Sequence, residues 1–107
     1  MADQKLSEPI ESGPKPDAGF WRVADAFIAN ANQHATSEEP GTVSAAFMYS
    51  AARFNSFVIA SQCGTKEALE NEKSAAIDYF VNQFKLALTE NVDDYLANFD
   101  KYLNFKG

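Results

Sequence analysis

The stretch from Thr42 to Gln62 most constrains what this chain can fold into, because its helical pattern is apolar all the way round. It contains no proline or glycine, and its single charged side chain is Arg53. A helix on the surface of a small protein normally has one apolar stripe and one polar face. The pattern therefore predicts a helix that is covered on most sides, either by the rest of the chain or by a second copy.

This helix has two apolar faces separated by two narrow polar edges. One face carries mostly large residues, which are Val43, Ala46, Phe47, Phe54, Phe57 and Val58. We expect a neighbouring helix of the same chain to cover it. The opposite face is the predicted interface with another molecule, and it consists of Ala45, Met48, Ala52 and Ile59.

Length and composition indicate one small folded unit. With 107 residues, 46% hydrophobic and 13% aromatic, the chain is too apolar to be disordered and too short for more than one domain. A chain of this size buries a modest share of its surface and gains stability from association. Nine Lys and Arg stand against fifteen Asp and Glu, and the basic residues are scattered. This balance argues against nucleic-acid binding, which relies on clustered basic side chains.

The sequence also predicts where the protein is located. The N-terminal residues lack the apolar segment of a signal peptide, and no apolar run is long enough to span a membrane. The single cysteine, Cys63, cannot form an internal disulfide. We therefore expect a cytoplasmic protein that does not enter the membrane.

The order of signals along the chain predicts an all-α fold. Residues 1–18 hold three of the four prolines and are predicted to be a disordered tail, followed by a single helical domain over residues 19–107. Asp17 is expected to cap a first amphipathic helix, which ends before Pro40 and Gly41. A short loop containing glycine favours an antiparallel hairpin with the helix of residues 42–62.

The C-terminal half predicts two more helices. Gly64 suits a left-handed helix end and Thr65 an N-cap, so a long third helix is expected from Lys66 to about Thr89. Asn91 is then expected to cap a short C-terminal helix. Its apolar face consists of Tyr95, Leu96, Phe99, Tyr102 and Leu103. No segment alternates with the period of two that is typical of a strand.

Residues that could carry chemistry have simpler structural explanations. His34 lies at the end of the first helix, where the helix dipole favours a cationic ring. The helix of residues 42–62 has no carboxylate, which argues against a di-metal centre inside the bundle. Cys63 has no basic neighbour to lower its pKa. We therefore predict no catalytic residue, no metal and no cofactor.

Arg53 is the residue that leaves two explanations open. Its charged head must reach water, pair with a carboxylate such as Asp78, or bind a ligand. Pairing is the favoured explanation. The alternative is a small-molecule or anion site on the polar edges of the helix, formed by Tyr49, Arg53, Asn55 and Ser56.

Four segments of the chain resemble a known protein family. They are FWRVADAFIANAN (20–32), VSAAFMYSAARFNSFV (43–58), YFVNQF (79–84) and LTENVDDYLANFDKY (88–102). They resemble the small proteobacterial domain-of-unknown-function 3144 family. The resemblance implies a compact helical protein of the bacterial cytoplasm, and it brings with it no activity, substrate, cofactor or functional residue.

Two functions of different classes follow. The first is a non-enzymatic protein that acts by forming a homo-oligomer or by binding a protein partner. The reason is that helix 42–62 has a second apolar face to cover. The second is a small-molecule or anion binder, with enzyme activity left open, that uses the polar edge around Arg53.

Overall fold

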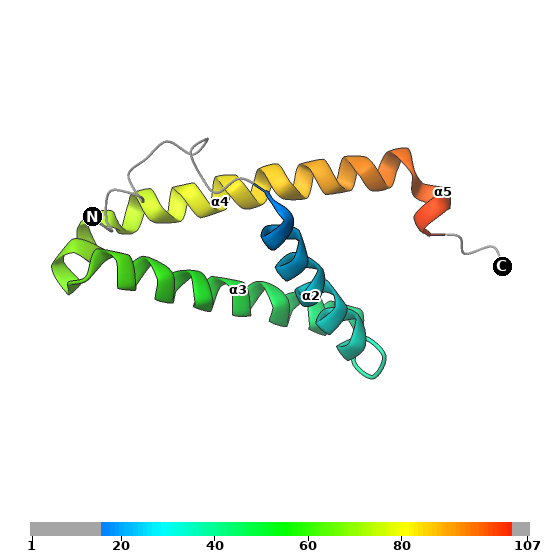
Figure 1. The fold of residues 1–107 in the computed structure, drawn as a ribbon, viewed down its shortest axis with the longest axis horizontal. Helices are drawn as coiled ribbons and strands as arrows, with labels where there is room; N and C mark the ends of the chain where they lie inside the picture. The colour runs from blue at the N-terminus through cyan, green and yellow to red at the C-terminus, as the bar shows by residue number, and fades with distance from the viewer. Residues whose placement is uncertain (1–15, 104–107) are drawn as a thin grey trace.

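The structure, a computed structural model, describes residues 16–103 and contains only helices in that range (Figure 1). The helices are α2 (Ala18–His34), α3 (Pro40–Cys63), α4 (Lys66–Ala97) and α5 (Phe99–Tyr102). Helices α3 and α4 run antiparallel, and α2 crosses α3 near its beginning (Figure 1). The predicted all-α fold, with a hairpin, a long third helix and a short C-terminal helix, is confirmed. The predicted disordered tail falls mainly on residues 1–15, which lie outside the described residues.

Three local capping signals act as the sequence predicts, whereas Pro40 and Gly41, predicted to lie in the loop, belong to the first turn of α3. The Asp17 carboxylate accepts a hydrogen bond from the Phe20 backbone N–H at 2.8 Å, which satisfies a donor that has no partner within α2. The Thr65 hydroxyl oxygen accepts one from the Ala68 N–H at 3.1 Å and does the same for α4. Gly64 adopts φ +83° directly after α3. This left-handed conformation ends the helix at little steric cost because glycine has no Cβ.

The predicted helix boundary at Asn91 is wrong. Helix α4 continues through Asn91 to Ala97, and the Asn91 side chain donates to the Ala87 carbonyl one turn earlier. An asparagine can bond back to its own helix as well as cap a new one, so its presence alone does not fix a helix start. The break comes instead at Asn98, whose φ of −124° and ψ of 33° lie outside the helical range. The C-terminal helix is consequently a single turn.

The described helices enclose very little. Ala76 on α4 is the one residue of this part of the chain that is buried, at 1% exposure. Half-buried side chains gather where α3 turns into α4; they are Val58, Ile59, Gln62, Cys63, Ala68, Leu69 and Glu72. The contact between α3 and α4 is therefore closest near the Gly64 turn. The three longer helices therefore pack in pairs, α2 on α3 and α3 on α4, without a filled core between them.

The Gly64 turn gives a matched pair of glycine substitutions. Gly64→Ala is expected to lower the free energy of unfolding by about 1 kcal/mol, because alanine is strained at positive φ. Gly41→Ala, inside α3, is expected to raise it by about 0.5 kcal/mol by restricting the unfolded chain. A Cβ at either position would meet no atom within 4 Å, so the difference is conformational. Urea unfolding measures both, and equal effects would contradict the role given to Gly64.

Candidate functional site

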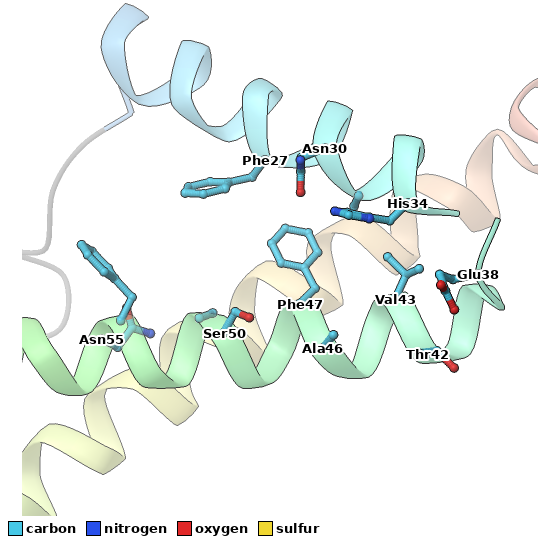
Figure 2. Close-up of a pocket in the computed structure, with 13 residues that line it drawn as sticks. Phe27, Asn30, His34, Glu38, Thr42, Val43, Ala46, Phe47, Ser50 and Asn55 are labelled. Carbon is cyan, nitrogen blue, oxygen red and sulfur yellow. The ribbon is translucent and has the colours of Figure 1, made fainter. Parts of the chain in front are cut away.

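A groove lies between α2 and α3, with a volume of about 780 Å³. Figure 2 shows side chains of both helices reaching into it. Its aromatic residues are Phe27 on α2 and Phe47 and Phe54 on α3. The other lining residues are Asn30, Ala31, His34, Glu38, Thr42, Val43, Ala46, Ser50, Ala51 and Asn55. The groove is thus mainly apolar, with a few polar side chains along it.

The groove exists because α2 and α3 meet at one end only. Near the loop, His34 and Val43 face each other, whereas the two helices stand farther apart at the end of the groove where Asn55 lies (Figure 2). Between these ends, the rings of Phe27 and Phe47 lie 6.4 Å apart. Helix α2 has 17 residues and α3 has 24, so α2 is about 26 Å long and α3 about 36 Å. Even side by side, α2 would leave about 10 Å of α3 without cover.

The predicted ligand residues are not brought together at this groove. Of the four, Asn55 lines it. Tyr49 is 69% exposed and Arg53 is exposed as well. The Ser56 hydroxyl donates to the Ala52 carbonyl of its own helix at 2.8 Å. Helical geometry explains this, because the two polar edges that hold these residues point in different directions.

The predicted partner of Arg53 is not found. Within residues 16–103 no carboxylate, that of Asp78 included, forms an ion pair with Arg53. Its guanidinium group lies on the exposed surface of α3, where water can solvate it.

The predicted interface residues divide into two groups. Ile59 is half-buried near the turn into α4, and Ala45, Met48 and Ala52 are exposed.

The sequence did not lead us to predict the α2 residues of the groove. Phe27 and His34 stand seven residues apart, two helical turns, which places them on one side of α2. That spacing was the available signal, but it is also the signal of an ordinary packed face.

The described residues offer neither a metal-binding cluster nor a membrane-spanning helix. No three His, Cys, Asp or Glu side chains within residues 16–103 gather closely enough to hold a metal ion. Among the described helices, none combines the length and apolar character needed to cross a membrane.

A comparison with known protein families identifies the family of this chain. A model of the family described as "Protein of unknown function (DUF3144)" matches residues 20–96. The chain belongs to the DUF3144 family. The match spans almost all of α2, α3 and α4, so both walls of the groove lie within it. Comparisons with curated proteins and with solved structures returned no match.

The DUF3144 match ends inside a C-terminal hook, which we define as residues 94–102. The Asp94 carboxylate accepts hydrogen bonds from the Asn98 side-chain amide at 2.9 Å and from the Tyr102 hydroxyl at 3.0 Å. The rings of Tyr95 and Tyr102 lie 4.7 Å apart. These contacts hold the short helix α5 back against the end of α4.

The hook predicts a pH dependence at alkaline pH. The hydrogen bond to Asp94, together with the negative charge of that carboxylate, raises the pKa of Tyr102 above its ordinary value of 10.0. A raised pKa means that the folded hook favours the neutral phenol. Its stabilisation is therefore complete below pH 10 and is lost as the pH rises through the raised pKa.

The measurement is a phenolate absorbance titration, with Tyr102→Phe subtracted to isolate this tyrosine. Asp94→Asn is expected to bring the Tyr102 midpoint down toward about 10. An unchanged midpoint in Asp94→Asn would show that the carboxylate does not control this proton.

Proposed function

We propose that this DUF3144 protein is a cytoplasmic, non-enzymatic protein that works by self-association through its helical surfaces. The observation that carries the proposal is the exposure of its apolar side chains. Twenty large hydrophobic residues of the described range are between 37% and 71% exposed, while a single small residue is buried. A soluble monomer rarely leaves so many large apolar side chains in water. Association with a second copy would bury it.

The area available is sufficient for a stable dimer. An aromatic side chain buries 150–250 Å² when fully covered, so half-exposed side chains of this size leave roughly 100 Å² each. Eleven of the twenty exposed residues are aromatic, and these alone leave roughly 1,100 Å². A standard protein interface takes about 800 Å² from each partner. The exposed aromatic side chains alone therefore exceed one partner's share of such an interface.

Light scattering coupled to size-exclusion chromatography tests the proposal. We expect a mass of at least twice the 11.8 kDa of the chain across the micromolar range. A mass of one chain at every concentration would refute self-association.

The alternative, a small-molecule or anion binder around Arg53, has weaker support. The groove is of a size that ligand sites have, and Asn55 lines it. Tyr49, Arg53 and Ser56 lie outside its lining, so a ligand in the groove would not meet the predicted cation. Binding of an anion that is lost in Arg53→Gln and kept in Lys85→Gln would favour this alternative.

A further inference from the structure

We propose that two copies of this chain pair through the groove, with their α3 helices crossing antiparallel at Ser50 and Ala51. The inference rests on the proposed self-association and names the surface and the symmetry that it uses. The occupant of the groove is then α3 of a second copy, and the groove of that copy is filled in return. Such a mutual arrangement is the isologous interface typical of homodimers.

The groove face of α3 is symmetric in sequence about the point between Ser50 and Ala51. Phe47 and Phe54 stand at equal distances before and after that point, and both line the groove. In an isologous interface, a residue that contacts a second residue is also contacted by it. An antiparallel crossing at this point brings Phe47 of each copy opposite Phe54 of the other, so the same contact forms on both sides of the axis. A face with this property is self-complementary.

The side chains at the crossing point have the sizes that close packing requires. Ser50 and Ala51 are small and allow two helix backbones to approach, and both line the groove. The aromatic rings stand one turn to either side of them. Phe54, which is 64% exposed, lies toward the open end of the groove. Phe27 of α2 and Phe47 of α3 lie 6.4 Å apart across the groove, so Phe54 of the second copy has an aromatic surface to pack against.

The distribution of charge also selects this face. Each copy has a formal net charge of −6, so an interface that brought acidic side chains together would be repelled. Helix α4 carries seven Asp or Glu and three Lys, whereas Arg53 is the one charged residue of α3. Arg53 is not among the residues that line the groove. Among the lining residues, Glu38 in the loop before α3 carries the one carboxylate, at the end of the groove away from the crossing point. Pairing through α3 therefore buries mainly apolar surface and leaves the acidic α4 helices apart.

Disulfide trapping tests the crossing point in the full-length chain. In a Cys63→Ser background, Ser50→Cys places one thiol on each copy at the proposed symmetry axis. Two cysteines can join when their Cα atoms lie within about 7 Å. We expect mild oxidation to convert most of Ser50→Cys into a covalent dimer. Ser56→Cys is the matched control, because Ser56 is also exposed on α3 but lies outside the groove.

The outcomes separate this inference from the proposed function. Trapping of Ser50→Cys without trapping of Ser56→Cys, together with a dimeric mass of the Cys63→Ser parent, supports the crossing. A dimeric mass with trapping at Ser56, or with none at either position, overturns the crossing and leaves self-association in place. A monomeric mass of both the natural chain and the Cys63→Ser parent refutes both, and an apolar ligand then becomes the better occupant of the groove.

Discussion

A tenfold increase in protein concentration is expected to raise the melting temperature by about 4 °C, because unfolding of a dimer also dissociates it. The magnitude follows from an unfolding enthalpy of about 0.7 kcal/mol per residue over the described helices of both copies. Between 10-fold dilution and 10-fold concentration the midpoint should therefore move by about 8 °C.

The shift depends on the sparse core of the isolated chain. Ala76 alone among the described residues is buried, so the packing within one copy contributes little of the stability of the folded state. Differential scanning calorimetry at several concentrations measures the shift. Urea at a fixed concentration, below the unfolding transition, should steepen the dependence by weakening the dimer. A midpoint that stays constant over a hundredfold range would contradict the proposed association.

The local parts of the fold were predictable because local interactions set them. The caps at Asp17 and Thr65 and the left-handed Gly64 each depend on a few neighbouring residues, and each occurs as predicted. The prediction at Asn91 failed because the same amide can cap a new helix or bond to its own. The apolar pattern continues past Asn91, and the helix continues with it. Competition of this kind cannot be settled by the residue alone.

The groove was harder to predict because it depends on how two helices diverge. The sequence indicates which side of α2 is apolar, and Phe27 does face Phe47. It does not indicate that the contact stops after this pair, since the crossing of two helices is fixed by tertiary packing. The predicted hairpin therefore forms, but α2 covers only part of α3. That difference moves the candidate interface from the face of Met48 to the face of Phe54.

Phe54→Asp is expected to abolish the dimer, and Met48→Asp to leave it intact. The two residues suit this comparison because they lie on the same helix with similar exposure, 64% for Phe54 and 60% for Met48. In an isolated copy both aspartates would be solvated, so both substitutions should affect monomer folding to a similar degree. A difference between them must then come from a surface that is covered on association.

The expected size follows from the burial of an aromatic side chain at the centre of an interface. Loss of such a residue costs about 2 kcal/mol or more, which raises the dimer Kd at least about thirtyfold. An unpaired carboxylate buried between the aromatic rings would add to this cost. Light scattering over a dilution series measures the Kd of each variant, and far-ultraviolet circular dichroism verifies that helix content is retained.

The reverse result would be equally informative about α3. If Met48→Asp dissociates the protein and Phe54→Asp does not, the interface is the face of Ala45, Met48, Ala52 and Ile59 that the sequence first indicated. The groove would then remain open in the dimer and available to a ligand. If both variants keep a dimeric mass, α3 is not the surface of association, and the exposed apolar residues of α4, such as Phe84 and Leu88, are the next to replace. The comparison therefore assigns the covered face of α3 by measurement of mass.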